Sequence, residues 1–157
     1  MKHLDIICPV IELAYDELND TERSLVDTAR QATYRSYAPY SKFSVGAAIL
    51  LGNGEVVAGA NQENAAFSSG TCAERSACFY AHSQYPDTDF RQIAIAARDA
   101  SGDFIDNPIP PCGACRQALL EYETLAGHSI GVLLVGRDKV YRLPSVASLL
   151  PLAFTEF

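Results

Sequence analysis

The positions of the cysteines are the strongest constraint that this chain of 157 residues places on its fold. Cys112 and Cys115 form a CxxC pair, and Cys72 lies upstream at a similar position in the predicted pattern. Each position falls in the first turn of a predicted helix, where unpaired N–H groups and the positive end of the helix dipole favour a thiolate. The sequence therefore predicts two helix starts that face each other and present three thiolates to one metal ion.

A CxxC pair alone could also be a redox pair or half of a zinc ribbon. We favour a metal site because a third cysteine is available and because a proline-rich loop precedes Cys112. Cys78 cannot join Cys72 on one ion, since six residues of helix separate them by about 9 Å of rise and about 240° of rotation. The histidines lack ligand spacing as well. Three ligands with an open fourth position are typical of a catalytic zinc.

The two remaining cysteines, Cys8 and Cys78, are expected to be small packing residues. Glu74 could serve either of two roles. Thr71 and Glu74 match a capping box, in which the carboxylate only satisfies the helix start. Beside an open zinc, however, a carboxylate two residues from a ligand can carry protons to and from the reacting atoms. We favour the catalytic role for Glu74.

The charge and the chain ends exclude several classes of protein. Lys and Arg number 12 and Asp and Glu 19, so the net charge is −7, which argues against a broad nucleic-acid surface. The first residues do not form a secretory signal, and no apolar run approaches the roughly 20 residues of a membrane span. Five cysteines cannot all pair internally. We therefore expect a cytoplasmic protein with reduced thiols and with neither a membrane nor a nucleic-acid partner.

The order of predicted elements indicates one α/β domain, a single sheet with helices packed on it. We expect helices over 21–36, 72–83 and 112–123, and strands over 43–51, 55–61, 93–97, 130–135 and 140–143. The turn at 52–54, Gly-Asn-Gly, predicts a hairpin between the first two strands. Residues 4–14 could form an extended arm or a strand, which Pro9 would confine to a sheet edge.

Four segments together resemble the cytidine deaminase family, and they occur in the family's order. They are Tyr37-Ala38-Pro39-Tyr40-Ser41-Lys42-Phe43 with Val45-Gly46-Ala47-Ala48, Asn61-Gln62-Glu63-Asn64-Ala65, Cys72-Ala73-Glu74-Arg75, and Pro111-Cys112-Gly113-Ala114-Cys115-Arg116-Gln117. The resemblance is to the small, homotetrameric members with three cysteine ligands, and it covers roughly residues 21–154. It implies a mixed five-stranded sheet sandwiched by helices. We divide the chain into an N-terminal extension, 1–20, and a catalytic domain, 21–157.

The resemblance implies a zinc-dependent hydrolysis of cytidine and 2′-deoxycytidine to uridine and 2′-deoxyuridine plus ammonia, as part of pyrimidine salvage. It implies one Zn²⁺ per subunit, bound by Cys72, Cys112 and Cys115, with Glu74 as the catalytic proton carrier. Arg75 resembles an arginine that donates hydrogen bonds to the ligand sulfurs. Because three thiolates and Zn²⁺ sum to −1, we hypothesise that Arg75 withdraws charge from sulfur and restores the acidity of the zinc.

The substrate contacts also come from the resemblance. Asn61 and Glu63 are expected on the ribose 3′-hydroxyl, where one partner donates and the other accepts. The other expected contacts are Phe43 on the pyrimidine, the Ala73 backbone on the base edge, Ala65 in the substrate loop, and Phe154 in a neighbouring subunit's pocket. For Phe43 and Phe154 ordinary core packing is the alternative, and for Asn61 it is a turn at a strand end.

Three competing functions remain open at this point. The chain could deaminate a nucleoside antibiotic such as blasticidin S, or RNA, or it could be a non-catalytic module stabilised by zinc. The net charge of −7 disfavours RNA. The Asn61 and Glu63 pair suits a free sugar, because the 3′-hydroxyl is esterified within a polymer. A structural zinc module would need a fourth protein ligand, and the sequence offers none at the right spacing.

Overall fold

The computed structural model describes residues 1–155, and within them it contains one sheet of six strands. The strands are β1 (Ile11–Ala14), β2 (Ser44–Leu51), β3 (Val56–Ala60), β4 (Phe90–Arg98), β5 (Gly131–Val135) and β6 (Lys139–Leu143). They run in the order β1-β6-β5-β4-β2-β3, with β4 and β5 parallel and the other neighbours antiparallel. The single mixed sheet is confirmed, but the expected count of five strands is wrong.

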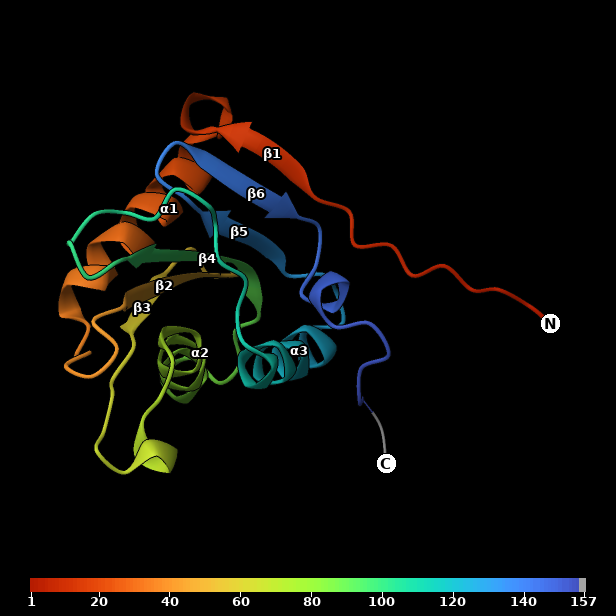
Figure 1. Cartoon of the computed structure of the whole chain (residues 1–157). Helices are drawn as coiled ribbons and strands as arrows, with labels where there is room; N and C mark the ends of the chain where they lie inside the picture. The colour runs from red at the N-terminus through yellow and green to blue at the C-terminus, as the bar shows by residue number, and fades with distance from the viewer. Residues whose placement is uncertain (156–157) are drawn as a thin grey trace.

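The sixth strand lies within residues 1–20, which we expected from the sequence to be an N-terminal extension. Ile11–Ala14 pairs antiparallel with β6, from Ile11 opposite Arg142 to Ala14 opposite Lys139. Pro9, which has no N–H to donate, lies before the paired residues, as an edge strand requires. Residues 1–10 have no regular structure and lead away from the body of the molecule (Figure 1). Cys8 lies in this exposed segment, so the expectation that it packs in the core is wrong.

Helices cover both faces of the sheet (Figure 1). Helix α1 (Asp20–Ala32) lies on one face, and α2 (Ala73–Gln84) and α3 (Gly113–Ala126) lie on the other. The alternation along β4 explains this sandwich, because alternate residues of a strand point to opposite faces. Ala94 and Ala96 belong to the core under α1, whereas Ile93 and Ile95 belong to the core under α2 and α3. Among the described residues, no helix has the length and apolar character needed to cross a membrane.

Close packing ties the end of β3 to the start of α2. A side chain at Gly59 would place its Cβ 2.5 Å from the backbone nitrogen of Ala77 and 2.8 Å from the carbonyl oxygen of Ala73, so only glycine lets β3 lie against α2. Just beyond β3, the Gln62 N–H donates to the Thr71 carbonyl and the Thr71 N–H donates to the Gln62 carbonyl, each at 2.9 Å. The residues that follow β3 and those that begin α2 are therefore held side by side.

A second tie fixes the loop that leads into α3. The Arg116 Nε donates to the Pro111 carbonyl at 2.8 Å, and its Nη1 donates to the Leu149 carbonyl at 2.6 Å. These bonds connect the proline-rich segment to the short helix η4 (Ala147–Leu149) near the C-terminus. The start of α3 is thereby held against the segment that follows β6.

Candidate active site

The three predicted ligand sulfurs come together where α2 and α3 begin. Cys72 is the N-cap of α2, Cys112 is the N-cap of α3, and Cys115 lies in the first turn of α3. The Sγ atoms of Cys72 and Cys112 are 3.9 Å apart, those of Cys112 and Cys115 are 3.4 Å apart, and all three lie within 4.8 Å of one another. Tetrahedral zinc with Zn–S bonds near 2.3 Å requires sulfurs about 3.8 Å apart. The donor set and its spacing fit zinc.

The electrostatics of the cluster also favour a cation. Hydrogen bonding with Cys115, Arg75 and Cys112 lowers the pKa of Cys72 to about 5 against the effect of its burial. The same bond to Cys72, together with burial, raises the pKa of Cys115. One thiolate thus forms readily, and its charge opposes the second. A bound cation removes this opposition, because it attracts every thiolate in the cluster.

The cluster has an open side. Cys115 is buried, whereas Cys72 is half-buried and Cys112 is exposed. Within residues 1–155 this is the only group of three or more Cys, His, Asp or Glu close enough to share a metal ion, and it contains no fourth protein ligand. Cys78 lies in the core, where burial raises the pKa of its thiol to about 12. The geometry matches a catalytic zinc rather than a closed structural one.

Glu74 lies against the cluster and not in a capping box. Cys72, not Thr71, is the N-cap of α2, and it makes no side-chain cap bond. Glu74 is only 4% exposed. Burial raises the pKa of Glu74, and the nearby Cys72 charge raises it further. A carboxyl group with a raised pKa is suited to exchange protons near neutral pH.

Arg75 faces the cluster from the next position of α2. Its Nη2 is 3.8 Å from the Cys72 sulfur, and the bond to that sulfur raises the pKa of the guanidinium. Its Nε is buried and has no hydrogen-bond partner within the part of the chain described. The Nε–H of Arg75 is therefore a hydrogen-bond donor that remains available at the edge of the metal cluster.

A cavity of about 560 Å³ opens beside Cys72, a size typical of small-molecule sites. Asn61, Glu63, Cys72 and Arg75 line it, so the structure brings four of the predicted site residues together. Phe67 also lines it, with a side chain that is 90% exposed.

The polar side chains of this cavity are already oriented by hydrogen bonds. Asn61 Oδ1 accepts from Ser36 Oγ at 2.6 Å and from the Val45 N–H at 2.7 Å, and Asn61 Nδ2 donates to the Phe43 carbonyl at 2.9 Å. Glu63 Oε2 accepts from the N–H groups of Tyr40 and Ser41, at 2.9 and 3.2 Å. The Ser41 hydroxyl and these N–H groups lower the pKa of Glu63, so the carboxylate is ionised at neutral pH.

The other predicted substrate residues lie outside the cavity wall. Phe43 is half-buried, Ala65 is exposed, and Ala73 is fully buried at the start of α2. Phe154 has a side chain that is 66% exposed, and its carbonyl accepts from Gln117 Nε2. Ala73 directly follows the ligand Cys72, whereas Phe43, Ala65 and Phe154 are not among the described residues that line the cavity.

Several residues that orient the site were missed in the sequence. They are Ser36, the backbone N–H groups of Tyr40 and Ser41, and Arg116. A backbone N–H leaves no mark in a sequence, and Ser36 is 25 residues from its partner. Arg116 carried a signal, because it directly follows Cys115 in the motif that runs from Pro111 to Gln117, and Tyr40 and Ser41 lie in the motif from Tyr37 to Phe43.

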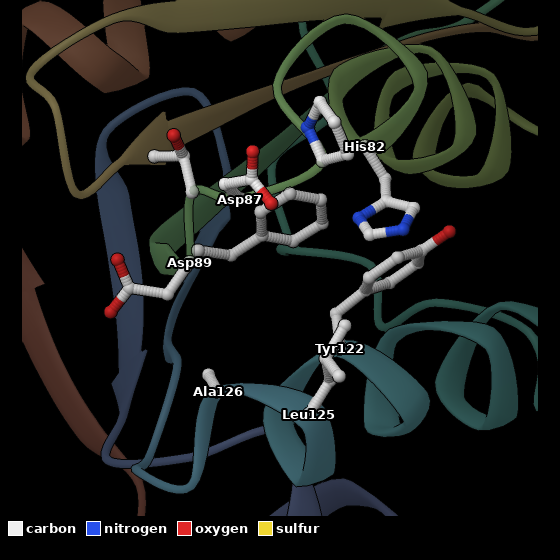
Figure 2. A pocket seen from close by; sticks show the side chains of 9 residues that line it. His82, Asp87, Asp89, Tyr122, Leu125 and Ala126 are labelled. Carbon is white, nitrogen blue, oxygen red and sulfur yellow. The ribbon is translucent and has the colours of Figure 1, made fainter.

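A second cavity, of about 300 Å³, lies at the other ends of α2 and α3 (Figure 2). His82 and Tyr122 face each other with ring centroids 5.3 Å apart, and the Tyr122 ring stacks on Phe90 at 4.6 Å. His82 is ten residues beyond Cys72, a rise of roughly 15 Å along the helix. This cavity is therefore separate from the cysteine cluster, and no cysteine lines it.

Comparisons with known proteins agree with the site. The family model of the cytidine and deoxycytidylate deaminase zinc-binding region matches residues 19–126. The chain is 41% identical over 131 residues to a cytidine deaminase of Halalkalibacterium halodurans, which covers 83% of this chain and 92% of that protein. It is 39% identical to a cytidine deaminase of Sporosarcina psychrophila over 137 residues, 87% of this chain and 93% of the relative.

Solved structures give the same result. The crystal structure of cytidine deaminase from Burkholderia pseudomallei superposes with a TM-score of 0.70 at 37% identity, over 83% of this chain and 97% of that one. The structure of the Mycobacterium tuberculosis cytidine deaminase superposes with a TM-score of 0.65 at 34% identity, over 86% and 98% of the two chains. The chain belongs to the cytidine and deoxycytidylate deaminase family.

Proposed function

We propose that this chain catalyses the zinc-dependent hydrolysis of free cytidine to uridine and ammonia. The observation that carries the proposal is a cluster of three cysteine sulfurs, one of which, Cys72, lines a cavity of about 560 Å³. The polar pair Asn61 and Glu63 lines the same cavity, and the buried Glu74 lies two residues beyond Cys72. This arrangement suits a ligand with a reactive base at one end and a hydroxylated sugar at the other.

Cys72, Cys112 and Cys115 would hold one Zn²⁺ per subunit. When bound, the ion supplies Lewis acidity that makes water a nucleophile near neutral pH. Arg75 donates to the Cys72 sulfur and so reduces the charge that the thiolates place on the metal.

Glu74 would move the protons of the reaction. Its carboxylate accepts a proton from the attacking water and delivers it to N3 of the base while the oxygen adds to C4. A further proton passes through Glu74 to the amino group, which leaves as ammonia. Burial of Glu74 raises its pKa toward the range in which both directions of transfer are effective.

Asn61 and Glu63 would hold the sugar. A free 3′-hydroxyl can accept from the Asn61 amide and donate to the Glu63 carboxylate. A phosphate at that position would meet the negative charge of Glu63, so the pair favours a nucleoside over RNA. The same contacts are available to 2′-deoxycytidine, which we include as a substrate. Release of uridine and 2′-deoxyuridine would place the enzyme in pyrimidine salvage.

The remaining contacts require a complete assembly. Phe43 and the Ala73 backbone would contact the base, Ala65 would belong to the substrate loop, and Phe154 would enter the pocket of a neighbouring subunit in a homotetramer. The Phe154 side chain is largely exposed within one chain, and such a contact would bury it. A cytoplasmic location, where thiols stay reduced, suits the three-thiolate site.

The test is an ultraviolet assay of cytidine loss with zinc quantified in the same sample. Cytidine, 2′-deoxycytidine, blasticidin S and a cytosine-containing RNA are compared as substrates, and light scattering gives the oligomeric state. We expect turnover of both nucleosides, one zinc per chain and a tetramer. Bound zinc without any turnover would indicate a structural zinc module. Preferential turnover of blasticidin S or RNA would assign the site to another deaminase activity.

A further inference from the structure

We propose that Ser36 is a positioning residue that fixes Asn61 as a hydrogen-bond donor toward the sugar of the substrate. This inference rests on the proposed nucleoside site and adds to it a residue that does not itself line the cavity. Ser36 follows the short helix η2 (Thr33–Arg35) at the end of α1, whereas Asn61 directly follows β3. Their bond therefore connects an element on one face of the sheet to the edge of the cavity.

The contacts of the Asn61 carboxamide set its polarity. An amide oxygen has two lone pairs, and here both are used, by Ser36 Oγ at 2.6 Å and by the Val45 N–H at 2.7 Å. One hydrogen of Nδ2 is used by the Phe43 carbonyl at 2.9 Å. The capacity that remains is the second hydrogen of Nδ2. Asn61 can therefore donate to a ligand but cannot accept from it.

Glu63 complements this arrangement on the same cavity wall. An ionised carboxylate only accepts, and Glu63 has acceptor positions beyond the two bonds from the Tyr40 and Ser41 N–H groups. A fixed donor next to a fixed acceptor matches a hydroxyl, which does both at one oxygen. If the Asn61 oxygen also had a spare lone pair, it would compete with Glu63 for the single hydroxyl hydrogen.

Ser36 is the part of this arrangement that a substitution can remove. The other two hydrogen bonds of the Asn61 side chain are made with the backbone of Phe43 and Val45, whereas the Ser36 bond is made with a side chain. Without the Ser36 hydroxyl, Oδ1 regains a lone pair and the carboxamide loses one of three restraints. Binding of the sugar should then weaken, because the donor is less preorganised, while the base and the metal cluster are unaffected.

The experiment compares Ser36→Ala with the wild type on cytidine and on 3′-deoxycytidine, which lacks the hydroxyl. We expect the KM for cytidine to rise about threefold to tenfold, the size of one lost hydrogen bond, with kcat within about twofold. The KM for 3′-deoxycytidine should not change. Ser36→Thr, which keeps the hydroxyl, should restore the KM for cytidine. Ser83→Ala is the matched control, since the Ser83 hydroxyl donates to the Tyr80 carbonyl near the far end of α2.

Two results would overturn the positioning role: a cytidine KM unchanged in Ser36→Ala, or an equal rise in KM for both nucleosides, as a general distortion of the pocket would give. Ser36→Cys, with a weak donor of similar size, provides the same contrast if Ser36→Ala does not fold. The wild type separates this inference from the proposed function. A wild type that leaves cytidine unchanged refutes the deaminase proposal itself, whereas normal wild-type turnover with the wrong Ser36→Ala pattern refutes only the role of Ser36.

Discussion

The N-terminal ends of helices α2 and α3 differ from the C-terminal end of α3 in how their polar groups are bonded. At the N-terminal ends, Cys72 and Cys112 occupy the cap positions without making any side-chain cap bond. At the C-terminal end of α3, Gly127 adopts a left-handed conformation at φ 68°, and its N–H donates to the carbonyls of Glu123 and Thr124. The Glu123 carboxylate accepts from three backbone N–H groups, those of Ile130, Val146 and Ala147.

This contrast shows where the molecule keeps polar groups available. The starts of the helices hold three sulfurs, a buried carboxyl and an unpartnered Arg75 Nε in the described chain, all facing one cluster. At the end of α3, by contrast, the buried Glu123 carboxylate is paired within the protein. A group whose hydrogen-bonding capacity is fully used stabilises the fold but cannot bind a ligand, whereas a group with unused capacity costs stability and can.

Removal of a buried ligand sulfur should give the largest effect. We expect Cys115→Ala to lose zinc and to lower activity by more than about 10⁴-fold, because two sulfurs cannot hold the ion in a fixed geometry. Metal analysis and the cytidine assay measure both losses. Cys8→Ala, at the exposed cysteine of the N-terminal segment, is the matched control and should keep zinc and activity. Full zinc content in Cys115→Ala would remove that residue from the ligand set.

The next effect separates proton transfer from metal binding. Glu74→Gln should lower kcat by about 10²- to 10⁴-fold, because the amide cannot carry a proton. Zinc content should stay unchanged, and thermal stability should not fall, since burial disfavours the charged form of Glu74. Glu55→Gln, in the exposed hairpin turn, is the control. A Glu74→Gln enzyme with normal kcat would contradict the catalytic role.

A substitution at the C-terminal end of α3 should lower the stability of the protein and leave its activity unchanged. Glu123→Ala leaves three backbone N–H groups without their acceptor and should lower the free energy of unfolding by roughly 3 kcal/mol. Urea unfolding followed by circular dichroism measures this, with the exposed Glu121→Ala for comparison. The folded fraction should keep the wild-type kcat. A loss of kcat without a loss of stability would erase the distinction between the two ends.

Arg75→Gln should have a smaller effect, on the pH dependence of activity. Because Arg75 donates to the Cys72 sulfur, its loss leaves more charge on the thiolates and makes the metal less acidic. We expect kcat/KM at neutral pH to fall about tenfold and the rise of activity to move to higher pH. The measurement is a pH profile on enzyme with full zinc occupancy. An unchanged profile at full occupancy would refute the proposed effect of Arg75.

The smallest effect concerns His128, next to the end of α3. Its Nε2 is 2.5 Å from Asp89 Oδ2, and this bond raises the pKa of His128 and lowers that of Asp89. The stabilisation is complete below the unfolded pKa of histidine, about 6.5, and is lost as the pH rises through the higher folded pKa. His128→Gln should therefore destabilise the protein more at pH 6 than at pH 8.5. Thermal unfolding at the two pH values measures the difference, and an equal loss at both would contradict it.

The metal site was largely predictable from the sequence because the features that mark each ligand are local. Helix starts favour thiolates, and the CxxC spacing places Cys112 and Cys115 on one face of a helix. The three helices and five of the strands followed from apolar patterns and turn signals in the same way. The rest depends on long-range contacts. No local pattern predicts that Ile11–Ala14 pairs with β6 or that Ser36 bonds Asn61.

The two wrong predictions, the count of five strands and the packing of Cys8 in the core, have the same physical cause. The apolar character of residues 4–14 is compatible with packing or with exposure, and only the partner strand decides which residues are covered. Residues 11–14 pair with β6 and form a strand, whereas Cys8 is exposed.

The pairing of β1 with β6 has a consequence for biosynthesis. The ribosome synthesises β1 well before β6. Ala14 cannot pair until its partner Lys139 has been synthesised, 125 residues later (139 − 14 = 125). At about 5 to 20 residues per second, that delay is roughly 6 to 25 s. During this interval the apolar side chains of the segment have no strand to join. The nascent chain should therefore be a target for chaperones that bind at the ribosome, and the sheet should close at β1 as one of the last steps of folding.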